Sequence, residues 1–141
     1  MTNLAETEYI ERIRVQTTLA ERLLAALMLV NGGAIIGLFT FLGNAATKDA
    51  ALRLDTAALW WGFAAFIIGV LAALTAFACA FLSQHHYTLA CHYQIEGRAE
   101  QERTEIIAGG KIYAAGIIAA IGSVASFGAG AFLSLMGVLP A

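Results

Sequence analysis

The apolar residues of this chain are gathered in three extended runs, which are separated by polar segments. The central run, residues 57–84, contains no Asp, Glu, Lys or Arg. Because an α-helix rises about 1.5 Å per residue, roughly 20 apolar residues cover the roughly 30 Å hydrocarbon core of a bilayer. Residues 57–84 are therefore predicted to form a membrane-spanning helix. Trp60 and Trp61 near its start are expected to anchor it at the headgroup level.

The other two apolar runs, residues 23–42 and 112–139, are also predicted to span the membrane. The third run would be about 42 Å long as a helix, so it is expected to tilt or to protrude from the bilayer. Tyr113 at its start is a further candidate anchor at the interface. Residues 43–56 form the predicted external loop, in which Asp55 or Thr56 is suited to cap the second spanning helix.

The polar segment 1–22 carries a stripe that continues into the first span. Its members follow alternating steps of three and four: Ile10, Ile13, Thr17, Ala20, Leu24, Leu27 and Asn31. This spacing predicts one long helix whose first part lies in water. Two alternatives remain open: an amphipathic segment on the membrane surface, and a cleavable signal peptide, against which the acidic residues Glu6, Glu8, Glu11 and Glu21 argue.

The polar segment 85–111 also has a helical pattern. Tyr87, Cys91, Ile95 and Ala99 recur every four residues, so the second helix is predicted to continue roughly two to four turns beyond the bilayer. Gly97 or the pair Gly109 and Gly110 would then let the chain turn. The fold class is thus predicted to be an all-α integral membrane protein, with three transmembrane helices and cytoplasmic helical extensions of the first two. These two extensions are expected to pack together as a small stalk.

Composition supports a membrane protein and sets its orientation. The chain is 60% hydrophobic and 13% charged, unlike an average soluble domain, and its net charge of -2 indicates no nucleic-acid partner. Basic residues favour the cytoplasmic side. Six lie on one side, Arg12, Arg14, Arg22, Arg98, Arg103 and Lys111, and two on the other, Lys48 and Arg53. We therefore expect a bacterial inner-membrane protein with a cytoplasmic N-terminus and an external C-terminus.

Small residues mark candidate surfaces for helix packing or oligomer formation. In the third run they repeat every four positions, at Gly122, Ser126, Gly130 and Ser134, and the first run contains Gly33 and Gly37. In lipid, helices associate through close backbone approach at such residues rather than through a hydrophobic driving force. The spacing therefore predicts self-association.

Three polar residues at membrane depth are candidates for an interhelical contact or a pore: Asn31, Thr40 and Thr75. Asn31 belongs to the stripe that faces a partner helix, so an interhelical hydrogen bond that fixes the register is one interpretation. The alternative is that Asn31 lines a water-filled path together with Thr40, Thr75 or Ser126.

The potential metal ligands are His85, His86, Cys91 and His92. On one helix His85 and His92 would lie about 10 Å apart, too far to hold one ion, because chelating pairs need a spacing of three or four residues. No metal or other cofactor is expected, and Cys79 and Cys91, about 18 Å apart along a helix, are not expected to form a disulfide.

An enzyme or a secondary transporter is not expected from these residues. The spans hold no carboxylate that could couple protons and no Lys or Arg that could bind an anion, and three spans are too few for an inverted-repeat transporter. Phosphate-loop, GxSxG and HExxH motifs are absent from the sequence.

The string LLAALMLVNGGAIIGLFTFLG, followed by a second span that ends in FLSQHHY, resembles a broad group of small bacterial membrane proteins with three spans. This resemblance implies the topology but no activity. Two functions are consistent with the chain: a homo-oligomer that forms or gates a pore for ions or small solutes, in the manner of a membrane-perturbing effector, and an accessory subunit of a larger membrane complex. A holin-like phage protein is a minor alternative, although such proteins carry a charged C-terminal tail whereas this chain ends in GVLPA.

Overall fold

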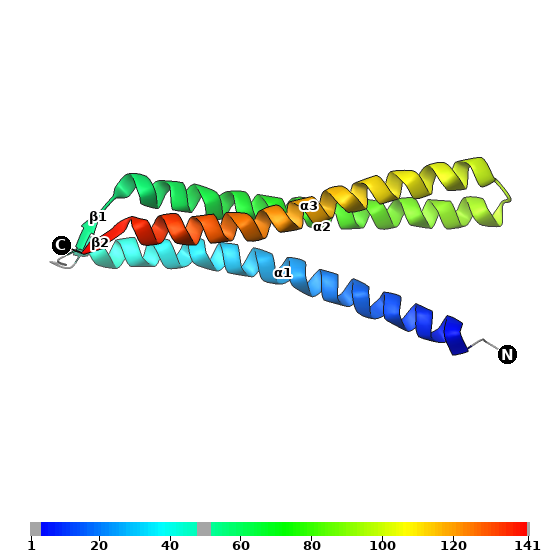
Figure 1. The fold of residues 1–141 in the computed structure, drawn as a ribbon, viewed down its shortest axis with the longest axis horizontal. Coiled ribbons are helices and arrows are strands. Elements are labelled where there is room, and N and C mark those ends of the chain that lie inside the picture. The colour runs from blue at the N-terminus through cyan, green and yellow to red at the C-terminus, as the bar shows by residue number, and fades with distance from the viewer. Residues whose placement is uncertain (1–3, 48–51, 141) are drawn as a thin grey trace.

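The computed structural model describes the backbone of residues 4–47 and 52–140, and it consists almost entirely of three long helices (Figure 1). These are α1 (Leu4–Thr47), α2 (Thr56–Ile95) and α3 (Ala99–Met136). Two three-residue strands, β1 (Leu52–Leu54) and β2 (Val138–Pro140), pair in antiparallel fashion. All three helices are long and apolar enough to cross a membrane. The all-helical fold with three candidate spans is thus confirmed, and so is the single long helix at the N-terminus.

Helices α2 and α3 form an antiparallel hairpin whose turn is at Gly97. The Gly97 N–H donates to the Gln94 carbonyl and the Arg98 N–H to the Tyr93 carbonyl, the two hydrogen bonds of a Schellman motif. Gly97 has φ 73°, a left-handed conformation that glycine adopts without steric cost. Of the two predicted turn positions, Gly97 is correct, and the pair Gly109 and Gly110 lies inside α3.

The third helix differs from its predicted range 112–139 at both ends. It begins at Ala99, because the chain turns back at once after Gly97 and the residues before Ile112 continue the same helix. It ends at Met136, because Gly137 caps it and the following residues pair with β1. At this end the Asp55 carboxylate accepts from the N–H groups of Ala57 and Ala58, which confirms the predicted cap of α2. Residues 48–51 of the predicted loop lie outside the described residues.

Seven-residue repeats of small, buried residues hold the hairpin together. The repeat in α2 consists of Gly62, Gly69, Ala76, Ser83 and Ala90, and the repeat along α3 consists of Gly109, Gly116, Ser123, Gly130 and Gly137. A seven-residue period keeps one seam facing the partner helix, as in a coiled coil. Most large apolar side chains of the hairpin point outward, with Trp61, Ile118 and Leu135 about 70% exposed, whereas Leu59 and Phe66 are buried. Small residues inside and large apolar residues outside suit a helix pair surrounded by lipid.

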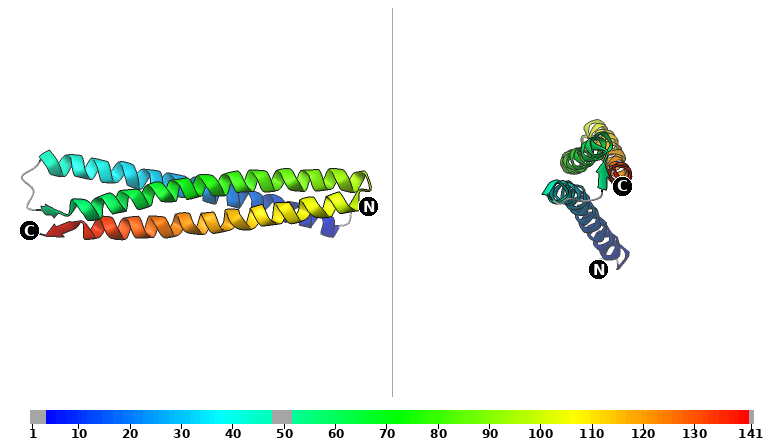
Figure 2. Two further views of the ribbon diagram at one scale, coloured as in Figure 1. Left: turned by 90° about the horizontal axis from the view of Figure 1, so that it is seen from above. Right: turned by 90° about the vertical axis from the view of Figure 1, so that its left-hand side faces the viewer.

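Helix α1 contacts the hairpin over only part of its length. Toward its C-terminus α1 lies along the hairpin, and toward its N-terminus it diverges (Figures 1 and 2). The predicted stalk between the extensions of α1 and α2 is therefore wrong. The extension of α2 packs on the first turns of α3 instead, because the small-residue repeat continues through Ser83 and Gly109. The predicted stripe residues Ile10 and Ile13 lie outside the residues whose side chains are described.

Candidate functional site

Asn31 lies at the point where all three helices meet. Its side chain is 0% exposed. The amide Nδ2 donates to the Leu27 carbonyl of its own helix at 2.9 Å and to Ser123 Oγ of α3 at 3.2 Å. The structure therefore places Asn31 in the interhelical hydrogen bond that its stripe position predicts.

Gly69 of α2 makes room for the Asn31 amide. A Cβ at position 69 would collide with Oδ1 and Cγ of Asn31, so the contact depends on a residue without a side chain. Asn31 Oδ1 is buried without a hydrogen-bond partner among the described residues. An interhelical hydrogen bond within a membrane stabilises by about 0.6 to 2 kcal/mol, whereas a buried unpaired acceptor costs about 1 to 3 kcal/mol. Asn31 thus contributes register rather than net stability.

A groove runs between α1 and the hairpin, on the side of Asn31 that is nearer the N-terminus of α1. We term it the α1 groove. It consists of two adjoining cavities of about 330 and 380 Å³. Both are lined by Ala20 and Leu24 of α1, Ala80 of α2 and Tyr113 of α3. The first cavity is otherwise apolar, and the second also includes Thr17, Glu21 and Gln84.

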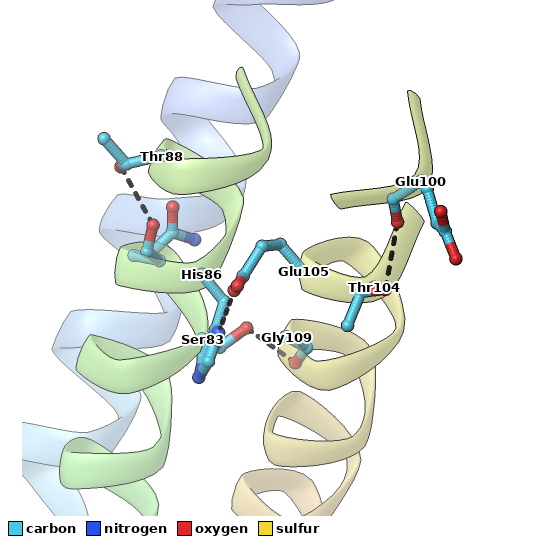
Figure 3. Close-up of polar contacts among 8 residues, drawn as sticks. Ser83, His86, Thr88, Glu100, Thr104, Glu105 and Gly109 are labelled. Carbon is cyan, nitrogen blue, oxygen red and sulfur yellow. Dashed lines mark hydrogen bonds and ion pairs between the residues drawn. The ribbon is translucent and has the colours of Figure 1, made fainter. Parts of the chain in front are cut away.

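The polar half of the hairpin contains two polar side-chain contacts between α2 and α3 (Figure 3). Ser83 Oγ donates to the Gly109 carbonyl at 3.0 Å, and His86 Nδ1 lies 2.6 Å from Glu105 Oε2. A serine, a histidine and a glutamate are thus close together, as in a hydrolase. However, Ser83 is 0% exposed and its hydroxyl is bonded to the backbone, so it is not placed to attack a substrate. These contacts join the two helices.

The histidines and cysteines are distributed over separate contacts. His86 pairs with Glu105 across the hairpin, and His92 Nε2 lies 3.2 Å from Glu96 Oε1 on its own helix. Among the residues whose side chains the structure describes, no three His, Cys, Asp or Glu residues are grouped so that they could hold a metal ion. Cys79 is half-buried and Cys91 is exposed, and both are free thiols.

The predicted packing residues differ in whether another helix of the same chain lies against them. Gly130 and Ser134 pack inside the chain: a Cβ at Gly130 would lie 3.0 Å from the Gly62 carbonyl of α2, and Ser134 contacts the same glycine. Gly33, Gly37 and Gly122 have open space where a Cβ would lie. Ser126 is half-buried.

The remaining predicted site residues lie on the outside of the helices. The hydroxyls of Thr40 and Thr75 donate to the carbonyls of Ile36 and Leu71 four residues earlier. Three aromatic anchors are exposed, with Trp60 and Trp61 in the first turns of α2 and Tyr113 at the α1 groove.

Sequence reasoning missed Gly69, Ser83 and Ser123 as packing residues. The sequence does contain the signal: small residues of α2 and α3 recur every seven positions, whereas the predicted packing surface of the third run follows a four-residue spacing. A step of four drifts around a helix by about 40° each time, and a step of seven by only about 20° in the opposite sense. The seven-residue stripe therefore stays on one face over a longer distance.

Comparisons with family models, with curated proteins and with solved structures find no match for this chain.

Proposed function

We propose that the protein is a three-span integral membrane protein that assembles with copies of itself. The observation that carries this proposal is the position of its open glycines. At Gly33 and Gly37 of α1 and at Gly122 of α3, no neighbouring segment lies within 4 Å of the position that a Cβ would take. Because helices in lipid associate where small residues allow close approach, these positions are the best places for a helix of another chain.

The open glycines of α1 and α3 occupy opposite faces of the molecule. Successive residues of a helix are rotated by about 100°, so Gly33 lies about 200° around α1 from Asn31, which faces the hairpin. Gly37 lies about 240° from Asn31, also on the outer side. On α3, Ala120 lines the α1 groove, and Gly122 is rotated by about 200° from it. A face of α1 on one copy is therefore available to a face of α3 on the next.

Such a contact joins two different surfaces, and it has a geometric consequence. Repeated contacts of this kind close into a ring or continue as a filament. Helices α1 and α3 run in the same direction along the molecule. Because Asn31 bonds to Ser123, Gly33 and Gly122 also lie at a similar depth. These two features support parallel packing of α1 on α3 of a neighbour, and we propose a closed ring.

The polar residues at membrane depth favour a structural assembly over an open pore. Thr40 and Thr75 satisfy their hydroxyls on their own helices, and Asn31 is completely buried. None of these three residues supports a hydrated path through the chain. That the assembly forms a pore is therefore a prediction separate from self-assembly. The accessory-subunit hypothesis, in which the partner is a different membrane protein, is also separate.

We further propose that the turn of the hairpin lies in the cytoplasm together with the N-terminus. Helix α2 has 40 residues and is about 60 Å long, roughly twice the thickness of the hydrocarbon core. The end of the hairpin beyond Gln84 carries the polar residues, including Arg98 in the turn and Arg103 in α3. The excess of basic residues on this side supports the orientation.

The experiment that tests self-assembly is the mass of the purified protein in mild detergent. We expect a discrete oligomer for the parent and smaller species for Gly33→Leu and Gly122→Leu, because a leucine at either position blocks close approach. Gly128→Leu is the matched control, since Gly128 is also open but lies about 120° from Gly122 around α3.

A parent protein that is monomeric, or two variants that assemble like the parent, would contradict the proposed interface. Ion flux through liposomes separates the remaining hypotheses. If vesicles that contain the assembled parent show no ion leak, the result supports a structural assembly. If they leak ions and Gly33→Leu removes the leak, the result supports the pore. A monomer that copurifies with a different membrane protein supports the accessory subunit.

A further inference from the structure

The α1 groove is a crevice between helices that already touch, and this determines what it can accept. Leu24 and Leu27 of α1 are buried against Ala73 and Ala76 of α2. Helices in such contact have axes about 8 to 10 Å apart, whereas a helix with its side chains is itself about 10 Å wide. A further helix therefore cannot enter between α1 and the hairpin.

The crevice exists because the hairpin presents small residues to α1. Ala80, Gly116 and Ala120 line the groove and leave space beside Leu24. The first cavity measures about 330 Å³, while an apolar cavity of about 150 Å³ is large enough to bind benzene. The groove thus has room for a flexible hydrocarbon chain.

We propose that the α1 groove binds one acyl chain of a membrane phospholipid whose headgroup carries an ammonium group. The groove extends from membrane depth at Leu27 past the N-terminal end of the first apolar run to Thr17 and Glu21. A chain in the apolar part would place its headgroup beside these residues and Gln84 of α2. This inference is independent of the proposed self-assembly, because the groove faces away from the open glycines of α1.

Charge at the mouth of the groove selects the headgroup. The mouth holds the carboxylate of Glu21, which has no ion-pair partner among the described residues. An ammonium group would be attracted to this carboxylate, whereas an anionic glycerol headgroup without an ammonium group would be repelled. Glu21 is exposed, and exposed ion pairs are weak. We expect a roughly two- to fivefold preference for phosphatidylethanolamine over phosphatidylglycerol.

The test uses the full chain reconstituted in vesicles of equal parts phosphatidylethanolamine and phosphatidylglycerol. After extraction in mild detergent, native mass spectrometry measures the retained lipid. We expect about one phospholipid per chain, enriched in phosphatidylethanolamine. Ala20→Phe places a ring in the groove and should abolish retention. Ala25→Phe is the matched control, because Ala25 is exposed, lies about 140° from Ala20 around α1 and does not line the groove.

A second pair of variants tests the headgroup. Glu21→Gln should keep the retained lipid but remove the preference for phosphatidylethanolamine, while Arg22→Gln, next to it in sequence, should leave the preference intact. The proposal is overturned if the parent retains no lipid, or if Ala20→Phe and Ala25→Phe retain the same amount. It is also overturned if Ala20→Phe lowers the oligomer mass, which would identify a second copy as the occupant. Circular dichroism confirms that each variant is helical.

Discussion

The two helix contacts of this protein differ in how they are built. The contact between α2 and α3 has a repeated unit: small residues face one another every seven positions from Gly62 and Gly130 to Ser83 and Gly109. The contact of α1 with the hairpin depends on a short apolar patch and a single buried amide, Asn31. In a membrane, where apolar burial does not drive helices together, repeated close approach holds a pair along its whole length, and one polar contact holds it at one point.

The same difference explains the shape of the molecule. The hairpin stays closed along its length, whereas α1 diverges from it toward its N-terminus (Figure 2). The side chains of α1 that face the hairpin are Leu24 and Leu27 rather than glycines. They hold the backbones further apart and leave the α1 groove beside them.

The largest effect is expected from a large side chain inside the repeat of the hairpin. A Cβ at Gly130 would lie 2.8 Å from the Phe66 ring and 3.0 Å from the Gly62 carbonyl, and the backbone cannot give way without separating the helices. Gly130→Leu should lower the free energy of unfolding by about 3 kcal/mol or more. Thermal unfolding in detergent, followed by circular dichroism, measures this change.

Gly128→Leu is the matched control for that experiment. Gly128 is two residues away on the same helix and has open space where a Cβ would lie. Its replacement should leave the stability unchanged or raise it slightly, because leucine is a better helix former than glycine. Equal destabilisation by both variants would mean that helix propensity, and not close packing, holds the hairpin.

A smaller effect, confined to α1, is expected at Gly69. Gly69→Ala would push the Asn31 amide out of its site and weaken the docking of α1 by about 1 to 3 kcal/mol. Hydrogen exchange should then become faster in α1, by about tenfold for each 1.4 kcal/mol, while α3 stays protected. Asn31→Ala in the same chain should recover part of the loss, because it removes the colliding amide.

That double substitution separates steric fit from a general loss of packing. If the losses from Gly69→Ala and Asn31→Ala simply add, the two residues do not interact, and the assignment of Asn31 as the register contact is wrong. A rescue shows that the amide and the missing side chain form one contact.

The sequence predicted this molecule well where one periodic signal dominated. The steps of three and four through Ala20, Leu24, Leu27 and Asn31 identified the face of α1 that meets the hairpin, and these residues do line that contact. Hydropathy likewise located three spans. Hydropathy could not give the true ends of α3. A helix that continues into water keeps its backbone hydrogen bonds, while its side chains change from apolar to polar.

The packing of the hairpin was less accessible because two small-residue patterns overlap in α3. Gly130 belongs both to the spacing of four with Ser126 and to the spacing of seven with Ser123. Only the seven-residue pattern has a counterpart in α2, at Gly62, Gly69 and Ala76. A comparison of periods between helices, rather than within one helix, would have found the pair.

The smallest effect is expected at the turn, which tests whether the hairpin depends on its loop or on its repeat. Gly97 has φ 73°, where an L-residue loses about 1 to 2 kcal/mol, although two Schellman hydrogen bonds hold the turn. Gly97→Ala should therefore lower the free energy of unfolding by about 1 kcal/mol, and Gly97→Asn by less, because asparagine tolerates this conformation better. Hydrogen exchange in α1 should not change, since the turn lies at the far end of the hairpin from Asn31. A loss as large as that of Gly130→Leu would show that the turn directs the pairing of α2 with α3, and that the seven-residue repeat only follows it.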